Sequence, residues 1–362
     1  MFVILLGSLL VIGSLFSCSE TPTNNGKDTC DTCDTTIPCD TCDTTKPNLD
    51  SLSHAFTWTE YSIPGVSSLT GVAVFSDNRI YAFGNDLYIF DGSKWTTYKV
   101  YIGSSTRAVD FIDRNVFAFS ESNYWSARGS IVYHCDGKFA EEYRDLGPYI
   151  DGSLRACWGT SETDMFFVGD YGAVTHFDGT TWTKMPRVTT KNLNWIWGSS
   201  HNDVWATGYN PNTDESVLIH YNGTSWKEDE FSTSGQTRQF GIGGVWACDS
   251  AGHTFASIAG TRVFRKTDNG PWRKDTSEIG NNLGGGQFVG IGIMGNTPND
   301  ILTVGGWGFV SHWNGKTWHR YDELYDLSNS NYAVSAVSMK GNTACVVGTK
   351  SGSSWIAIGR RK

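Results

Sequence analysis

Residues 195–228 read WIWGSSHNDVWATGYNPNTDESVLIHYNGTSWKE. Apolar side chains alternate with others along this stretch, at Trp195 and Trp197 and again at Val204 and Ala206, and turn residues separate the alternating runs. A period of two is typical of short β-strands with one buried face. The stretch therefore predicts three short strands that lead to a fourth, with a hairpin between the last two.

An Asn-Gly or Asp-Gly pair marks this last hairpin in every copy of the stretch. Both central residues of a type I′ turn have positive φ, which Asn and Gly accept at low cost, so we expect that turn at Asn222-Gly223. The pairs are Asp91-Gly92, Asp136-Gly137, Asp178-Gly179, Asn222-Gly223, Asn269-Gly270 and Asn314-Gly315, at intervals of 45, 42, 44, 47 and 45 residues. An aromatic residue follows each pair and is expected to open the fourth, outermost strand: Trp95, Phe139, Trp182, Trp226, Trp272 and Trp318. A period of about 45 residues with four strands per repeat predicts a β-propeller.

A seventh unit begins at Tyr332, but only three of its strands fit before Lys362. Residues 56–61, FTWTEY, read like the fourth strand of the other units, for example residues 94–98, KWTTY. An N-terminal strand that completes the C-terminal blade removes two open sheet edges and closes the ring. We therefore predict an all-β fold, a seven-bladed β-propeller of four-stranded antiparallel blades over residues 55–362.

The strands before each turn share further motifs. WGTS at 158–161 matches WGSS at 197–200, and DMFFVG at 164–169 matches DVWATG at 203–208 and DILTVG at 300–305. In these motifs residues 55–362 resemble secreted bacterial propeller repeat proteins, broadly the Asp-box and photosystem-assembly-factor-like propellers. The resemblance implies the fold but no single activity, because propellers carry binding proteins and enzymes alike. Asp178 and Trp182 stand one residue too close for the sialidase Asp box.

Residues 1–16 form an apolar run without a charged side chain. The run is short for a bilayer span of roughly 20 residues but suits the apolar core of a signal peptide. LFSC at 15–18 resembles a bacterial lipobox, in which the cysteine becomes the lipidated first residue of the mature protein. We expect residues 1–17 to be a signal peptide and Cys18 to carry a lipid anchor, at the outer membrane of a bacterial cell envelope. A plain secretory signal cleaved nearby is the alternative.

Residues 18–54 are rich in Thr, Asp, Pro and Cys and contain the tandem nonamers CDTCDTTIP and CDTCDTTKP. Seven acidic residues against two lysines between residues 19 and 50 give −5 of the chain's net charge of −9. With few apolar residues the segment cannot offset its ordering entropy, so we expect a disordered spacer. Four thiolates also suit zinc, but only five residues separate the pairs Cys30/Cys33 and Cys39/Cys42. Disulfides in an oxidising compartment are the preferred interpretation.

Composition argues against several function classes. A net charge of −9 without a basic cluster disfavours a nucleic-acid partner. The sequence contains no GxSxG or HExxH motif, and the glycines at 284–286 fall in a connection between blades. We expect no cofactor and contact with a membrane only through the lipid anchor. The remaining cysteines are interpreted as small buried side chains of strands: Cys135, Cys157, Cys248 and Cys345.

The histidines occupy one repeated position. His134, His176, His220 and His312 each stand two residues before the turn Asp or Asn, so they lie on different blades and cannot converge on one metal. By the order of strands, the Asp that opens the second strand lies beside the His that ends the third. We predict Asp–His hydrogen bonds within blades 3, 4 and 6, between Asp164 and His176, Asp203 and His220, and Asp300 and His312.

Loops are the more promising place for function. Those between the second and third strands emerge beside the connections between blades, around the mouth of the central channel. We place aromatic residues in them, Tyr124, Trp125, Tyr171, Tyr209 and Trp307, and expect exposed rings that bind a protein or a glycan. Rings that pack on neighbouring loops are the alternative. Residues 120–130 and 209–216 are interpreted as lengthened loops, and the second of these is unique to its copy.

Arg107 and Arg155 precede the innermost strands assigned to blades 2 and 3, so both are candidates to meet an acidic group at the channel mouth. Between blades the chain also carries carboxylates that a glycoside hydrolase would need: Asp145, Asp151, Glu278 and Asp322. The sequence thus favours a non-catalytic binding or scaffolding propeller of the cell envelope. A glycan-active hydrolase or lyase, with acidic or Tyr residues at the channel mouth, is the alternative.

Overall fold

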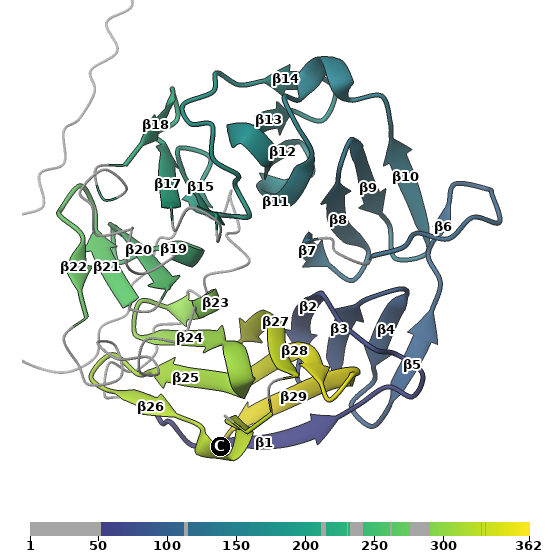
Figure 1. Ribbon diagram of the computed structural model, residues 1–362, viewed down its shortest axis with the longest axis vertical. Coiled ribbons are helices and arrows are strands. Elements are labelled where there is room, and N and C mark those ends of the chain that lie inside the picture. The colour runs from purple at the N-terminus through teal and green to yellow at the C-terminus, as the bar shows by residue number, and fades with distance from the viewer. Residues whose placement is uncertain are drawn as a thin grey trace, which may run out of the picture. The chain divides into compact units, whose positions relative to one another are not determined.

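Seven β-sheets, each built on four antiparallel strands, are arranged around a common centre in the described part of the chain (Figure 1). The structure is a computed structural model that describes residues 52–111, 115–210, 215–229, 231, 242–260, 263–275, 290–326, 328–329 and 331–362. Within strands, the side chains of residues 209, 210, 215, 259, 260, 290 and 291 lie outside this description. The predicted seven-bladed propeller of four-stranded blades is confirmed.

The first four blades are formed in chain order. Blade 1 consists of β2 (Gly71–Ser76), β3 (Arg79–Phe83), β4 (Leu87–Phe90) and β5 (Trp95–Tyr98). Blade 2 consists of β7 (Asn115–Ser120), β8 (Asn123–Arg128), β9 (Ile131–Cys135) and β10 (Phe139–Tyr143), with β6 (Tyr101–Ile102) added in parallel to β10. Blade 3 consists of β11 (Leu154–Ser161), β12 (Asp164–Gly169), β13 (Val174–Phe177) and β14 (Trp182–Lys184). Blade 4 consists of β15 (Trp195–Ser200), β16 (Asp203–Asn210), β17 (Glu215–Tyr221) and β18 (Trp226–Glu228).

The remaining blades follow the same plan. Blade 5 consists of β19 (Ile242–Ser250), β20 (His253–Gly260), β21 (Val263–Thr267) and β22 (Arg273–Lys274). Blade 6 consists of β23 (Gly290–Thr297), β24 (Asp300–Gly305), β25 (Phe309–Trp313) and β26 (Trp318–Arg320). Blade 7 consists of β27 (Tyr332–Lys340), β28 (Thr343–Lys350), β29 (Ser353–Arg361) and β1 (Phe56–Tyr61). Short 3-10 turns occur at η1 (Gly147–Tyr149), η2 (Asp170–Gly172), η4 (Gly306–Gly308) and η5 (Asp322–Leu324).

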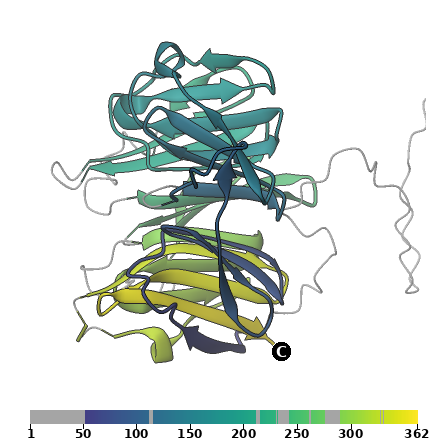
Figure 2. The ribbon, with the colours of Figure 1, turned by 90° about the vertical axis from the view of Figure 1, so that its right-hand side faces the viewer.

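The outer strand of blade 7 comes from the other end of the chain. Strand β1 pairs antiparallel with β29, with Phe56 opposite Arg361 and Tyr61 opposite Ile356. In both views the purple β1 lies beside the yellow strands of blade 7 (Figure 1, Figure 2). The pairing covers the edge that β29 would otherwise expose.

The hairpin between the third and fourth strands differs from the predicted type I′ turn. Gly223 has a φ of 84°, whereas Asn222 is not among the residues with positive φ. Tyr221 pairs with Trp226, so the loop holds four residues, and the side-chain Oδ1 of Asn222 accepts hydrogen bonds from the backbone N–H groups of Thr224 and Ser225, at 3.1 and 3.0 Å. The same side-chain cap recurs at Asp91, Asp136, Asp178 and Asn314. The Asp or Asn is therefore present for its side-chain oxygen rather than for its tolerance of positive φ.

Tryptophans of the innermost strands connect neighbouring blades. Trp158 of blade 3 lies over Gly198 of blade 4, where an added Cβ would stand 2.6 Å from the ring. Trp197 of blade 4 donates a hydrogen bond from Nε1 to the carbonyl oxygen of Ala247 in blade 5, at 3.1 Å. The repeated Trp-Gly motif is thus explained by packing between blades, since the small residue makes room for the ring of the preceding blade.

The four cysteines predicted to be strand residues are buried in β9, β11, β19 and β28, as expected. Burial raises the pKa of Cys157 to about 12, which opposes formation of the thiolate that a nucleophile requires. Residues 1–51 lie outside the described residues, so the predicted signal peptide, Cys18 and the CxxC pairs stay predictions. Among the described residues, no helix has both the length and the apolar character of a membrane span.

Candidate binding face and blade latches

A cavity of about 420 Å³ lies where the innermost strands of the blades meet. The strands β2, β7, β11, β15, β19, β23 and β27 all contribute to its lining, so the cavity is the central channel of the propeller. Side chains that line it include Asn115, Arg155, Asn194, Trp195, Met294 and Ser335. Arg155 is the charged group among the described lining residues, which include no Asp or Glu.

Two of the predicted aromatic residues stand in tight turns between the second and third strands of their blades. Tyr171 in η2 and Trp307 in η4 have φ values of 56° and 57°, in the left-handed region that bulky residues rarely adopt. A glycine follows each ring at positive φ, and a Cβ on Gly172 or Gly308 would stand about 2 Å from a backbone oxygen of the connection to the next blade. The turns are therefore pressed against those connections and hold the two aromatic residues in fixed positions.

The two rings differ in exposure. Tyr171 is 62% exposed, the most exposed of the large hydrophobic side chains among the described residues, and Trp307 is half-buried. The backbone N–H of Tyr171 donates a hydrogen bond to Oδ1 of Asn192, at 3.0 Å, and the backbone N–H of Asp326 donates one to the carbonyl oxygen of Trp307, at 2.9 Å. The loop expectation is confirmed for both residues, and the expected exposure holds fully for Tyr171.

Arg155 connects the channel to the Tyr171 turn. It lies in β11, lines the cavity, and pairs through Nε with Oδ1 of Asp170, the residue directly before Tyr171. The side chain of Arg155 is 46% exposed and that of Asp170 19%. Asp170 thus ties Arg155, which lies at the channel as expected, to the turn that carries the exposed Tyr171.

Tyr124 and Trp125 do not belong to a loop, and their predicted exposure is wrong. They lie in β8, the second strand of blade 2, and both are 0% exposed. Trp125 stacks on His134, with ring centroids 4.1 Å apart. Residues 120–130 are therefore mostly strand rather than a lengthened loop. The sequence repeat itself indicates that a strand begins here, because SESN at 120–123 aligns with SETD at 161–164, where β12 begins.

Arg107 and Tyr209 also differ from expectation. Arg107 precedes β7 by eight residues rather than standing next to it, and its guanidinium contacts Glu142 in the outer strand β10. It is not among the residues that line the channel, so its predicted place at the channel mouth is wrong. Tyr209 lies at the end of β16, opposite Ser216. Its side chain and residues 211–214 lie outside the described residues, so the blade 4 loop stays a prediction.

The predicted Asp–His hydrogen bonds are confirmed in all three blades. Nε2 of His176, His220 and His312 lies 2.7 Å from Oδ1 of Asp164, Asp203 and Asp300, respectively. Blade 2 has the same contact with an amide in place of the acid, because Nε2 of His134 lies 3.0 Å from Oδ1 of Asn123. We call these pairs latches, since each ties the second strand of a blade to the third.

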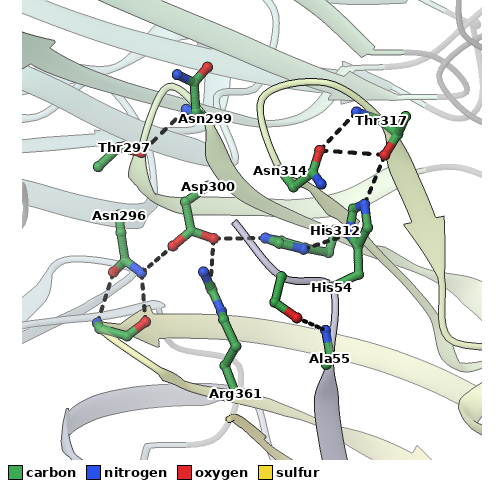
Figure 3. A network of polar contacts seen from close by, with 12 residues as sticks. His54, Ala55, Asn296, Thr297, Asn299, Asp300, His312, Asn314, Thr317 and Arg361 are labelled. Carbon is green, nitrogen blue, oxygen red and sulfur yellow. Dashed lines mark hydrogen bonds and ion pairs between the residues drawn. The ribbon is translucent and has the colours of Figure 1, made fainter. Parts of the chain in front are cut away.

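The blade 6 latch is buried and continues into blade 7 (Figure 3). Nη2 of Arg361 donates to Oδ1 of Asp300 at 2.6 Å, and Nδ2 of Asn296 donates to Oδ2 at 2.8 Å. Burial disfavours the ionised form of Asp300, but the hydrogen bond from His312 and the charge of Arg361 outweigh it, so the pKa of Asp300 is lowered. Asp300 is therefore a buried carboxylate held in its charged form.

His54 extends this network from the N-terminal side (Figure 3). Because His312 donates from Nε2 to a carboxylate, its Nδ1 in the neutral ring is an acceptor, so Nδ1–H of His54 donates to it at 2.9 Å. Nε2 of His54 then accepts from the hydroxyl of Thr317 at 3.0 Å. Burial, with the neighbouring His312, His319 and Arg361, lowers the pKa of His54 to about 4. The network thus requires His54 to be neutral.

Sequence reasoning missed one side chain of the blade 3 latch. His201, in the turn between β15 and β16 of blade 4, places Nδ1 at 2.8 Å from Oδ1 of Asp164. The same turn position in earlier blades carries Glu121 and Glu162, and each contacts the second or third strand of the preceding blade. Applying this blade-to-blade rule to the sequence would have placed His201 beside Asp164.

Comparisons with known proteins identify fold neighbours only. No family model and no curated protein matches this sequence. A structure of YCF48 bound to D1 peptide is similar at 14% identity, with a TM-score of 0.62 over 86% of this chain and 99% of the other. YCF48 from Cyanidioschyzon merolae follows at 15% identity, with a TM-score of 0.58 over 83% and 98% of the two chains. The WD40 β-propeller domain of Doa1 has 11% identity and a TM-score of 0.59 over 86% and 98%.

Proposed function

We propose that this protein is a non-catalytic binding propeller that recognises a segment of a partner protein at the mouth of its channel. The observation that carries the proposal is the exposed ring of Tyr171, held in a fixed turn beside the Arg155–Asp170 pair. A rigid aromatic side chain loses little conformational entropy on binding and is a common anchor of protein interfaces. The adjacent guanidinium and carboxylate supply polar contacts that fix the orientation of a bound chain.

The channel supports a peptide as the ligand class. Its lining combines the guanidinium of Arg155 with amides and apolar side chains, which suits an extended chain that offers both backbone groups and side chains. One fold neighbour, YCF48, has been solved with a peptide bound. At 14% identity this neighbour shares the fold with our chain, and its ligand serves only as a precedent for peptide binding by a propeller of this shape.

The cellular setting in this proposal rests on the sequence. The apolar residues 1–16 and Cys18 suggest export and a lipid anchor, and residues 18–54 suggest a spacer long enough to hold the propeller away from a membrane. We infer a position at the bacterial cell envelope, with an envelope protein as the partner. Metabolic labelling with a lipid precursor tests the anchor separately from binding. We expect the full chain to be labelled and the Cys18→Ala variant not to be labelled.

No observation on the described residues favours the glycan-active enzyme over binding. Asp151 pairs with Lys184 at 2.5 Å and with Arg187 at 3.3 Å, and Asp322 pairs with Arg320 at 2.5 Å. Neither carboxylate, nor Asp145, lines the channel, and Glu278 lies outside the described residues. Asp145, Asp151 and Asp322, the three of these groups that the structure describes, are not shown as a carboxylate pair facing one site, which glycoside hydrolysis requires.

The test is a selection of displayed random peptides against the immobilised full chain, run beside a glycan array. Enriched peptides are measured again with Tyr171→Ala and with Tyr98→Ala, a matched control that is 37% exposed in the outer strand β5. Loss of an anchor of about 2 kcal/mol weakens binding roughly 30-fold, and we expect this for Tyr171→Ala but not for Tyr98→Ala. Glycan binding without peptide binding, or peptides indifferent to Tyr171→Ala, would contradict the proposal.

A further inference from the structure

Three potential metal ligands meet at the junction of blades 3 and 4. Asp164 opens β12, His176 lies in β13, and His201 lies in the turn between β15 and β16. Oδ1 of Asp164 is 2.7 Å from Nε2 of His176 and 2.8 Å from Nδ1 of His201. The ligand atoms of the three residues all lie within 4.8 Å of one another, and no other group of this kind occurs among the described residues.

The distances suit a small divalent ion. Zinc bonds of about 2.0–2.1 Å to nitrogen and oxygen hold tetrahedral ligands roughly 3.3 Å apart. The two nitrogen–oxygen contacts must therefore lengthen by about half an ångström to admit zinc, which small side-chain rotations provide. Two imidazoles and one carboxylate are also a donor set that first-row transition metals bind well.

Surrounding groups orient these ligands. The hydroxyl of Thr160 donates to Oδ2 of Asp164, which leaves Oδ1 directed at the two histidines. The ring of Phe166 packs 4.5 Å from His176 and 5.7 Å from His201, measured between centroids. Such contacts around a ligand set fix ring orientation before the metal arrives. The side chains of Asp164 and His176 are 15% and 19% exposed and that of His201 is 46% exposed, so water can complete the coordination.

The other latches show why this junction is distinct. Oδ1 of the aspartate accepts a second hydrogen bond in each blade, but the donor differs: Trp205 Nε1 in blade 4, at 3.0 Å, and Arg361 in blade 6. Neither donor is a metal ligand. In blade 6 His54 contacts the opposite ring nitrogen of His312 from the one that faces Asp300, so those three groups do not converge. Of the three aspartate latches, only that of blade 3 gains a metal ligand from its second donor, His201.

We propose that Asp164, His176 and His201 form a binding site for a divalent transition-metal ion such as Zn²⁺. The ion joins the second and third strands of blade 3 to the first hairpin of blade 4. Metal that binds only the folded chain stabilises it in proportion to the metal concentration relative to the dissociation constant. The site is separate from the Tyr171 face, and its existence does not depend on the proposed peptide-binding function.

The test measures zinc binding to the full chain by isothermal titration calorimetry after treatment with a chelator. Cys30, Cys33, Cys39 and Cys42 are changed to Ser in every sample, because their thiolates are competing zinc ligands. We expect one zinc ion per chain, a higher melting temperature with zinc, and at least tenfold weaker binding in His201→Gln. His220→Gln, which alters the equivalent latch of blade 4, is the matched control and should bind zinc as before.

A second measurement guards against a folding defect. Melting without metal establishes that His201→Gln is folded, and cobalt absorption spectra report the ligand set directly. We expect ligand-field bands without thiolate charge transfer, changed by His201→Gln and His176→Gln and unchanged by His220→Gln. Absence of stoichiometric zinc binding, or binding that both His176→Gln and His201→Gln leave intact, would overturn the proposal.

Discussion

Replacing Asp300 with Asn probes the buried latch of blade 6. The carboxylate is 3% exposed and accepts from His312, Arg361 and Asn296 at 2.6–2.8 Å. Asn has the same shape but carries no charge, and its amide NH₂ would face a donor on one side. The change therefore leaves the guanidinium of Arg361, whose side chain is 4% exposed, without its anionic partner.

The cost follows from the buried cation. Breaking a buried ion pair by removing one partner costs about 3–5 kcal/mol, because the remaining charge is uncompensated. The matched change, Asp203→Asn in blade 4, also breaks a latch, but its partners are His220, Trp205 and Ser199, and none of them is a buried cation. We expect it to cost about 1 kcal/mol, the usual net worth of a hydrogen bond.

Urea unfolding followed by tryptophan fluorescence measures both costs. We expect Asp300→Asn to lower the free energy of unfolding by about 2–4 kcal/mol more than Asp203→Asn does. If the orphaned guanidinium is the cause, adding Arg361→Met to Asp300→Asn should restore part of the loss. Equal costs for the two Asn variants, or no recovery in the double variant, would refute this reasoning.

Three further predictions follow from the same contacts. Because the folded pKa of His54 is about 4, below its ordinary 6.5, the unfolded chain binds the extra proton, and stability falls as the pH drops from about 6.5 towards 4. His54→Gln should flatten this part of a stability–pH profile, and an unchanged profile would contradict the assignment. At Tyr171, with φ of 56°, Gly should be more stable than Ala by about 1 kcal/mol in urea unfolding, the reverse of their usual order in a strand. Gly198→Ala places a Cβ 2.6 Å from Trp158 and should cost about 1–3 kcal/mol, whereas Ala247→Gly at the same place in blade 5 should cost under about 1; equal costs would argue against the packing role.

The repeat made most of the fold predictable. Each blade must bury the same faces, so turn residues and aromatic residues recur at nearly constant spacing, and the period identifies the architecture without any single strand being certain. The type of the hairpin turn was harder to predict from the sequence. The four residues from Asn222 to Ser225 make a loop too long for a two-residue turn, and this spacing, rather than the Asn-Gly pair, determines the hairpin.

The position of a candidate site residue was predictable where the residue follows the repeat. The prediction was wrong where the repeat was misaligned. Tyr171 stands in a turn of blade 3 that recurs in blade 6, where Trp307 takes the equivalent position. Its place in a turn is therefore predictable from the sequence. Tyr124 lies in a strand rather than in the expected loop, because β8 begins at Asn123, and the asparagine stands where blades 3, 4 and 6 have the aspartate that marks the start of the second strand. Contacts between blades, such as that of His201, need the ring order as well as the repeat.

The junctions show how departures from the repeat should be interpreted. One turn position carries Glu121, Glu162 and His201, and its partners in the preceding blades change with it: Arg79, then Asn123 and His134, then Asp164. A glutamate meets donors and a histidine meets a carboxylate, so the variation preserves complementary hydrogen-bonding groups between neighbours. A residue that differs from the repeat but has a matching partner in the preceding blade indicates a contact that holds the blades together. His201 is such a residue, and it also completes the proposed metal-ligand set. The turn of Tyr171 is held by its contacts with the next connection, but its ring is 62% exposed, and an exposed ring in a fixed turn is the stronger indication of an external ligand.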